Sequence, residues 1–475
     1  MEKLLEPTVM KFGGTSVEDA RAFERVMNII RERERAHPVV IVSAMSRFTD
    51  ALIESVRVAA EEADAQSASL ILEQHLARHL EVARQLLAVD ATATIEREIE
   101  SARREINELL RIVASHPVTR PPLQDEIAAY GERLSSFLLA SILHHNGLKA
   151  QYVDARKCLL TDDTYGSAAP LIAETETRTH NLLAPLITDS SIPVLGGFIA
   201  STVSGATTTL GRGGSDYTAA LVGAALRARE VEIWTDVTGV LTADPRVVKA
   251  ARTIARLSYS EAAELAYFGA KVLHPKTIQP AIEKGIPVRI CNSRAPGEHG
   301  TLIRAEAERH PRAVKAIAHK TGITTVQITS GRMLGAYGFL RAIFEIFDRH
   351  RTVVDVVTTS EVSVSLSLDD TRSLPSIIKE LEGLGTVEVE EHRAIICVVG
   401  ESLRATPGVA ARIFGTIYDV NVSLVSLGAS SINLTFAVDE DRVTEVVRRL
   451  HEALFERDEE QWQEMDELAT RGAAL

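Results

Sequence analysis

Two glycine-rich segments supply residues that could bind an anion. In the first, residues 11–16 read KFGGTS, so that a strand-like run ends at two glycines just before a helical pattern. Glycines let backbone N–H groups approach an anion, a helix N-terminus adds partial positive charge, and Lys11 adds a full one. The same pattern also fits a tight turn with a surface lysine, and spacing alone leaves both interpretations open.

In the second segment, residues 207–217 read TTTLGRGGSDY ahead of a helix expected over 218–226. Arg212 and the neighbouring hydroxyl groups suit a phosphate or a carboxylate. Asp216 lies where a helix cap or a first-turn acid would lie. An acid among so many anion donors could instead orient lysines or bind Mg²⁺ through water. A second anion loop in one domain favours a binding site over two unrelated turns.

Two further segments carry polar groups near predicted strands. Residues 234–246 read WTDVTGVLTADPR and follow a strand. Loops at the carboxyl ends of parallel strands are where ligands bind in α/β proteins. Residues 268–275 read FGAKVLHP; taken alone, Lys271 in this segment is a surface lysine.

The elements that must position these segments alternate between strands and helices. Strand-like runs are predicted at 8–12, 39–42, 192–195, 232–234 and 287–290. Such alternation predicts right-handed βαβ units and a mainly parallel sheet with helices on both faces. Ser16 is expected to cap the first helix, with Asp19 completing a capping box. Residues 61–115 predict a helical excursion with a solvated charged face, to which no chemistry is assigned.

An internal repeat follows a polar linker at 306–311. Gly338 matches Gly408 at an offset of 70 residues, and Ser360 matches Ser430. Each copy reads as strand, helix, strand, strand, helix. The predicted helices span 338–349 and 408–418, and the predicted strand pairs are 353–359 with 362–368 and 422–427 with 432–438. Because turn residues match as well as apolar ones, the pattern predicts two copies of a small α+β module.

Composition excludes several classes of protein. The net charge is −13, which argues against a bulk nucleic-acid surface, and hydrophobic residues make up 45% of the chain, as in a globular protein. No apolar run approaches the roughly 20 residues of a membrane helix. The chain lacks the P-loop, G-x-G-x-x-G, protein-kinase and H-E-x-x-H motifs. Three widely spaced cysteines favour a reducing compartment and fit no zinc site.

In this order, KFGGTS, GRGGSD and GAKVLHP resemble the signatures of the aspartate kinases of the amino-acid kinase family. The resemblance covers nearly the whole chain. It implies an α/β fold: a three-layer αβα, carbamate kinase-like domain over 1–306, with a mainly parallel sheet. Two ferredoxin-like ACT domains would follow at 323–393 and 394–465, and a strand at 313–322 could belong to the second.

The resemblance implies transfer of the ATP γ-phosphoryl group to L-aspartate, the first step of lysine, threonine and methionine biosynthesis. A carboxylate is already ionised at pH 7, so the site needs cations and oriented donors against repulsion rather than a general base. By resemblance, Lys11 and Lys271 hold the phosphates with the N–H groups of Gly13 and Gly14. Asp216 would organise the lysines, and Mg²⁺ would bridge the β- and γ-phosphates.

The resemblance also assigns two groups of binding residues. For aspartate they are Arg212 as carboxylate clamp, Glu132 for the α-ammonium group, and Ser43, Thr49, Phe198, Gly213, Ser215 and Asp216 around them. For ATP they are Lys11, Gly13, Gly14, Thr235, Asp236, Leu241, Asp244, Arg246 and Lys271. Some relatives carry Tyr where Leu241 stands, so Leu241 offers adenine only an apolar face.

Acidic residues distinguish the two copies of the repeat. Asp355 aligns with Val425 and Glu361 with Ser431, so these acids occur only in the first copy. An effector with an extra positive charge would prefer that copy, because a paired charge offsets desolvation; L-lysine fits. The alternative is that both are solvated edge-strand acids. The resemblance places an inhibitory lysine site, at a dimer interface, on Met333, Gly338, Phe339, Leu340, Val354, Asp355, Ser360, Glu361 and Val362.

Two other functions remain open at this point. One is another amino-acid kinase, acting on glutamate, N-acetylglutamate or a nucleotide; the ACT pair with Glu132 and Arg212 argues against it. The other is a catalytically weak amino-acid sensor, against which Lys11, Asp216 and Lys271 argue. We expect a cytoplasmic homodimer or homotetramer joined through its ACT domains, with neither nucleic-acid nor membrane partners.

Overall fold

The computed structural model describes residues 6–269, 273–306, 313–335, 337–428 and 430–456. The chain divides into two compact units. The first unit consists of Met1–Val240, Ala255–Tyr259 and Val272–Glu306. The second consists of Leu241–Ile254, Ser260–Lys271 and Ala307–Leu475.

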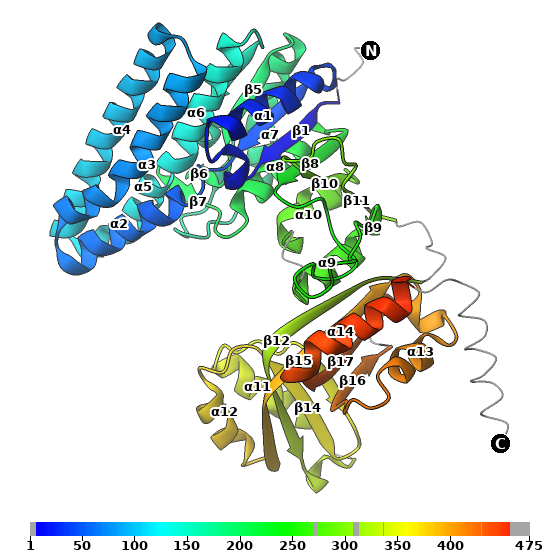
Figure 1. Ribbon diagram of the computed structural model, residues 1–475. Coiled ribbons are helices and arrows are strands. Elements are labelled where there is room, and N and C mark those ends of the chain that lie inside the picture. The colour runs from blue at the N-terminus through cyan, green and yellow to red at the C-terminus, as the bar shows by residue number, and fades with distance from the viewer. Residues whose placement is uncertain (1–5, 270–272, 307–312, 336, 429, 457–475) are drawn as a thin grey trace. The chain divides into compact units, whose positions relative to one another are not determined.

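An eight-stranded sheet organises the first unit (Figure 1). Its neighbouring strands run parallel except for the antiparallel β10–β11 pair. Strand β2 is buried throughout, as expected when helices cover both faces of a parallel sheet. In spatial order the strands are β3 (Ala150–Val153), β5 (Ile192–Gly196), β2 (Pro38–Val42), β1 (Thr8–Phe12), β8 (Glu230–Thr235), β10 (Val288–Asn292), β11 (Thr301–Arg304) and β9 (Arg256–Ser258).

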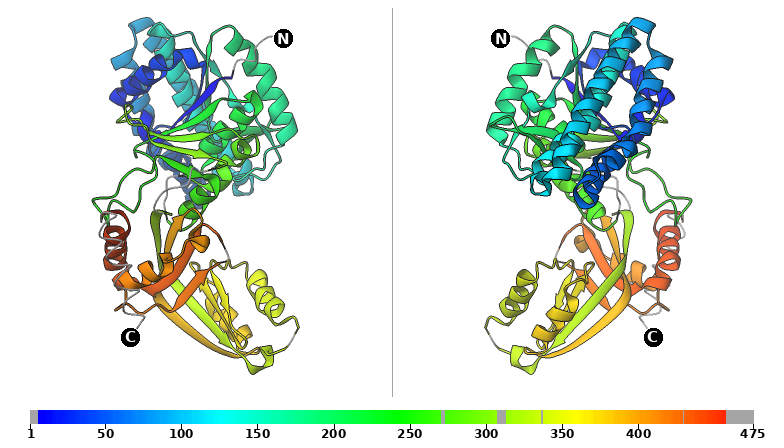
Figure 2. Two further views of the ribbon diagram at one scale, coloured as in Figure 1. Left: turned by 90° about the vertical axis from the view of Figure 1, so that its right-hand side faces the viewer. Right: turned by 90° about the vertical axis from the view of Figure 1, so that its left-hand side faces the viewer.

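Helices lie on both sides of this sheet (Figure 2), which confirms the predicted α/β fold. On one side α8 approaches so closely that a Cβ on Gly223 would lie 2.8 Å from Val231. A separate sheet joins β4 (Leu160–Thr161), β6 (Ile199–Thr202) and β7 (Thr207–Thr209). The helices are α1 (Ala20–Glu32), α2 (Phe48–Glu62), α3 (Ala65–Leu86), α4 (Val89–Ser115), α5 (Arg120–Ala128), α6 (Tyr130–His145), α7 (Ile172–Thr188), α8 (Gly214–Leu226) and α10 (Pro275–Glu283).

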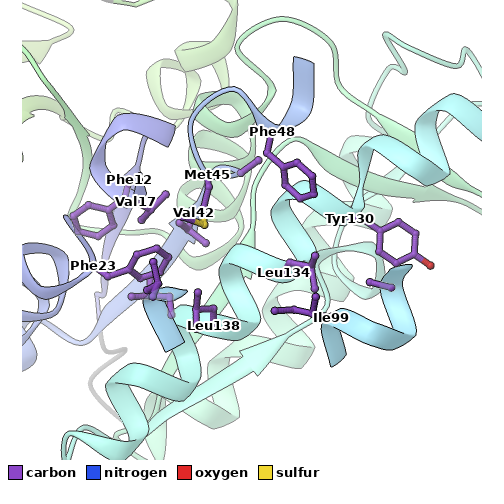
Figure 3. Close-up of a cluster of buried hydrophobic side chains, with 14 of the residues drawn as sticks. Phe12, Val17, Phe23, Val42, Met45, Phe48, Ile99, Tyr130, Leu134 and Leu138 are labelled. Atoms are coloured by element: carbon purple, nitrogen blue, oxygen red, sulfur yellow. The ribbon is translucent and has the colours of Figure 1, made fainter. Parts of the chain in front are cut away.

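The predicted helical excursion is confirmed as α3, α4 and the end of α2. Its apolar stripe, including Leu76 and Ile99, is continuous with the core beneath β1 and β2. Figure 3 shows Phe48, Tyr130 and Leu134 in this shared core, and each of these three residues is 4% exposed or less. The helical excursion therefore packs against Met45 and Phe48, which follow β2.

The start of the first helix differs from the prediction. Asp19, not Ser16, is the N-cap of α1, because its carboxylate accepts the Ala22 N–H at 2.8 Å. Ser16 lies in a preceding 3₁₀ turn and donates its hydroxyl to the Ser293 Oγ at 2.8 Å. A Gly-Gly-Thr-Ser sequence can form such a turn before the helix begins, and periodicity does not distinguish the two. Similarly, α8 begins at Gly214, four residues before the prediction.

One antiparallel sheet of six strands unites both repeat copies in the second unit (Figure 1). The two long central strands pair along most of their lengths, so the first residues of β12 face the end of β15. In spatial order the strands are β13 (Val357–Thr359), β14 (Ser363–Leu368), β12 (Val314–Thr329), β15 (Thr386–Gly400), β17 (Asn433–Asp439) and β16 (Leu424–Leu427). The helices are α9 (Tyr259–Tyr267), α11 (Phe339–Arg349), α12 (Leu374–Leu381), α13 (Val409–Thr416) and α14 (Val443–His451).

Each copy of the repeat has a core of its own. Helices α11 and α12 bury Ile343 and Ile377 against one end of the sheet. Helices α13 and α14 bury Ile413 and Val447 against the other. The repeat predicted from the sequence therefore corresponds to two helix-covered halves of one sheet. The strand predicted at 353–359 is shorter in the structure and spans Val357–Thr359, although the Asp355 N–H and the Val356 carbonyl oxygen already form hydrogen bonds with Ser367.

Candidate active site

A pocket of about 550 Å³ opens in the first unit, at the carboxyl ends of its central strands. The loops after β1, β2, β5 and β8 meet there with the first turn of α8, as the rule for parallel sheets predicts. The pocket brings together many residues singled out from the sequence: Lys11, Gly13, Gly14, Ser43, Thr49, Glu132, Phe198, Gly213, Ser215, Asp216, Thr235 and Asp236.

Lys11 and Asp216 form an ion pair in this pocket. The Lys11 Nζ lies 2.6 Å from the Asp216 Oδ1, and the two side chains are 12% and 15% exposed. Lys11 comes from the end of β1 and Asp216 from the first turn of α8. The pair therefore holds an ammonium group at a fixed point of the pocket wall.

Glu132, in the first turn of α6, is the most unusual group of the pocket. Its side chain is 3% exposed, and its Oε1 accepts the Ala44 N–H at 3.1 Å. The buried Oε2 has no hydrogen-bond partner among the described residues. Burial raises the pKa of Glu132 to about 8, against smaller lowering effects of the Ala44 N–H and Lys11. A carboxyl oxygen of this kind is suited to receive the ammonium group of a ligand.

Close backbone contacts shape the pocket wall. A Cβ on Gly197 would lie 2.6 Å from the Ser215 Cβ, and one on Gly214 would lie 2.8 Å from the Phe198 ring. Phe198 itself has a φ of 65°, in the left-handed region that bulky residues avoid. The loop after β5 and the start of α8 can therefore meet only because two glycines lie between them.

Backbone contacts within the fold hold the Gly-Gly segment in place. The Gly13 N–H donates to the Trp234 carbonyl oxygen at 3.1 Å. This N–H is engaged within the fold, and the assignment of Gly13 as a phosphate donor stays a prediction. The position of Gly14 is tightly constrained, because a Cβ there would lie 2.9 Å from the Ala44 carbonyl oxygen.

Sequence reasoning missed several lining residues, most of them between the end of β2 and the first turn of α2. Thr15, Ala44, Met45, Ser46, Arg47 and Asp50 also line the pocket. Arg47 is exposed and has a φ of 67°. The available signal was the set of polar residues Ser46, Arg47, Thr49 and Asp50 shortly after a fully buried strand, since the end of a parallel strand is a ligand position.

Arg78 of the helical excursion supports this loop from behind. Its Nη2 donates to the Ser46 carbonyl oxygen at 2.6 Å, although the sequence analysis assigned no chemistry to residues 61–115. Burial lowers the pKa of Arg78, while Glu18 and Asp19 act in the opposite direction. His75 and His79 pack on Phe48, at ring distances of 5.4 and 5.1 Å. The excursion therefore positions the loop rather than contacting a ligand.

Some predicted residues are not brought into the pocket. Arg212 is exposed and is not among the lining residues, although Gly211 and Gly213 on either side of it are. Leu241, Asp244 and Arg246 belong to the second unit, where the Arg246 guanidinium pairs with Asp244 at 2.6 Å. Lys271 lies outside the described residues.

Comparisons with known proteins agree with this architecture. Residues 6–292 match the amino acid kinase family, and residues 396–454 match the ACT domain. Lysine-sensitive aspartokinase 3 of Escherichia coli (strain K12) is 38% identical over 471 residues, which cover 95% of this chain and all of the relative. This chain belongs to the aspartokinases of the amino-acid kinase family.

Solved aspartokinase structures share the fold. The crystal structure of E. coli aspartokinase III in complex with aspartate and ADP, in the R-state, superposes with a TM-score of 0.80, covering 95% of this chain and 100% of that one at 38% identity. The T-state complex of that enzyme with lysine and aspartate gives 0.78, covering 94% and 99% at 38% identity. Like these aspartokinases, the chain combines an α/β kinase sheet with an antiparallel ACT region. None of its described helices is long and apolar enough to cross a membrane.

The raised pKa of Glu132 predicts an unusual dependence of stability on pH. Between about pH 4.5 and 8 the folded chain retains a proton on Glu132 that the unfolded chain has lost. Glu132 therefore lowers the free energy of unfolding as pH rises through this window, by up to about 1.4 kcal/mol per pH unit. Glu132→Gln removes this titration.

Urea unfolding of both proteins from pH 6 to 9 measures the effect. The free energy of unfolding of Glu132→Gln minus that of the parent should increase as pH rises, and this difference should become constant above about pH 8. A difference that stays constant across this range would show that Glu132 titrates normally.

Proposed function

We propose that the pocket transfers the γ-phosphoryl group of ATP to the β-carboxylate of L-aspartate, giving 4-phospho-L-aspartate. The observation that carries the proposal is the buried, unpartnered Glu132 oxygen in the same pocket as the Lys11–Asp216 ion pair. An amino acid presents both an ammonium group and carboxylates, which these groups complement. Aspartate and ADP are bound together in the similar E. coli enzyme.

The chemical step requires little acid–base work from the protein. The attacking carboxylate is ionised at neutral pH, and the barrier comes from its repulsion by the triphosphate. Lys11, held by Asp216, supplies fixed positive charge where negative charge is transferred. We assign the same role to Lys271 by the resemblance of its motif.

Substrate orientation is assigned to the remaining pocket residues. Glu132 accepts the α-ammonium group and becomes ionised when it does so, because an adjacent cation favours the charged carboxylate. Arg212 is assigned to the substrate carboxylate: it is exposed between two lining glycines, so it can turn over a bound ligand. Ser43, Thr49, Phe198 and Ser215 complete the aspartate pocket.

For the nucleotide we assign Thr235, Asp236, Leu241, Asp244 and Arg246 together with the Gly-Gly turn. The described residues contain no group of three or more metal-ligating side chains. Mg²⁺ usually binds one or two carboxylates together with substrate phosphates and water. Asp216 and Asp236, which both line the pocket, fit that sparse donor set, and the metal would supply charge neutralisation at the β- and γ-phosphates.

An acceptor screen tests the assigned reaction. With ATP and a coupled readout of ADP, we expect turnover with L-aspartate and none with glutamate, N-acetylglutamate or nucleotides. Lys11→Met should lower kcat at least 100-fold, because a preorganised charge at the transferred group is lost. Lys149→Met, which removes an exposed lysine paired with Asp189, is the control. Turnover with another acceptor, or full turnover of Lys11→Met, would refute the assignment.

We further propose feedback inhibition by L-lysine at the first repeat copy. The T-state structure of the similar E. coli enzyme contains lysine. In this chain Asp355 has a side chain only 2% exposed, whereas Glu361 is exposed near the start of β14. The other residues assigned to the site are Met333, Gly338, Phe339, Leu340, Val354, Ser360 and Val362.

Assembly through the ACT region is part of this proposal. The outer strands β13 and β16 carry exposed apolar side chains, namely Val357 on the first and Val425 and Leu427 on the second, each 37–45% exposed. Exposed apolar side chains gathered in one region are typical of interaction surfaces. They suit a homodimer or homotetramer.

Neutralising the buried acid tests the effector site. Asp355→Asn should raise the half-inhibitory L-lysine concentration at least tenfold, because the lost charge no longer balances the effector ammonium. Steady-state inhibition and calorimetric lysine titration measure the change, with Asp370→Asn, at an exposed pair with Arg372, as control. Unchanged lysine inhibition of Asp355→Asn would remove Asp355 from the site.

A further inference from the structure

Asp355 already has partners within the chain. Its Oδ1 accepts a hydrogen bond from the Tyr267 hydroxyl at the end of α9. Its Oδ2 lies 3.2 Å from the Lys320 Nζ on β12. Both carboxylate oxygens are therefore engaged, and the side chain is almost fully buried. An effector ammonium group would therefore have to share this carboxylate with Lys320.

Lys320 is held in a way that resembles a bound cationic ligand. Its Nζ contacts two carboxylates, Asp355 at 3.2 Å and Asp369 at 2.6 Å. It also lies 5.3 Å from the centre of the Tyr267 ring, within the range of cation–π attraction. Burial opposes the charge, but the two acids outweigh it and raise the pKa of Lys320. The ammonium group of Lys320 thus occupies a small acidic and aromatic site.

We propose that Lys320 is an internal competitor of L-lysine, whose ammonium group holds Asp355 in the unliganded chain and sets the lysine concentration needed for inhibition. This inference rests on the proposed lysine regulation. Lys320 would repel a second ammonium group at the same carboxylate, and in this proposal the effector displaces it. Asp369, with a side chain 42% exposed, can retain Lys320 when it leaves Asp355.

The competition has a calculable consequence. When only a fraction of the molecules can bind a ligand, the apparent association constant is the intrinsic constant multiplied by that fraction. If Lys320 holds Asp355 in about nine of ten molecules, the apparent affinity for lysine falls about tenfold. Removing the ammonium group of Lys320 should therefore make the chain more sensitive to lysine.

The experiment is an L-lysine titration of the full-length chain. Each protein is assayed for ADP formation, normalised to its own rate without lysine, and lysine binding is measured by calorimetry. Lys320→Met should lower the half-inhibitory concentration and the Kd about tenfold. Lys320→Gln, which keeps a polar side chain if the apolar variant folds poorly, should act in the same direction.

Three controls isolate the ammonium group. Lys320→Arg keeps a cation and should stay within about twofold of the parent. Lys379→Met removes an exposed lysine from α12 of the same copy and should change nothing. The increase in lysine sensitivity caused by Lys320→Met should disappear when Asp355→Asn is also present, as expected for residues that act on one site.

The outcomes separate this inference from the proposed regulation. In one outcome the parent is inhibited by lysine while Lys320→Met and Lys320→Gln are equally or less sensitive. That result would overturn the proposal that Lys320 competes with lysine, and the proposed lysine regulation would stand. No inhibition and no binding in the parent and in both variants would overturn both proposals. A weakly sensitive parent with a strongly sensitive Lys320→Met would support both.

Discussion

A buried carboxyl group with one open oxygen is the constraint on which the active site depends. Glu132 is held by the Ala44 N–H on one side, while its second oxygen meets no donor among the described residues. A Cβ on Gly196 would lie 2.9 Å from the Glu132 Cβ, so β5 and α6 enclose the group tightly. Nearby, Lys11 is fixed by Asp216. The pocket thus contains a buried carboxyl oxygen of Glu132 without a partner among the described residues, together with the Lys11 ammonium group paired with Asp216.

In the second unit the buried carboxylate of Asp355 is paired in a different way. The side chain of Asp355 is also almost fully buried, but Tyr267 and Lys320 each contact one of its oxygens. A buried charge is costly unless it is paired. At the catalytic pocket the substrate is proposed to supply the missing partner. At the proposed effector site the chain supplies its own partner, Lys320, which the effector is proposed to displace.

Much of this arrangement could be predicted from the sequence, because strand ends and helix starts have local signals. The position of Lys11 before two glycines, and that of Asp216 in the first turn of a helix, placed both at one edge of a parallel sheet. Contacts between distant segments left no such signal. The bond from Arg78 to the Ser46 carbonyl oxygen, the engagement of the Gly13 N–H and the pairing of Asp355 with Tyr267 depend on tertiary packing. Choosing Asp19 over Ser16 as helix cap required the geometry of the preceding turn.

The proton on Glu132 offers the most direct test of the central claim. Calorimetric titration of the parent with L-aspartate at pH 7, in two buffers of different ionisation enthalpy, counts the protons exchanged on binding. With a pKa of about 8 before binding and ionisation enforced by the substrate ammonium group, nearly one proton should be released per site, and Glu132→Gln should release none. A binding enthalpy that does not depend on the buffer would contradict the account.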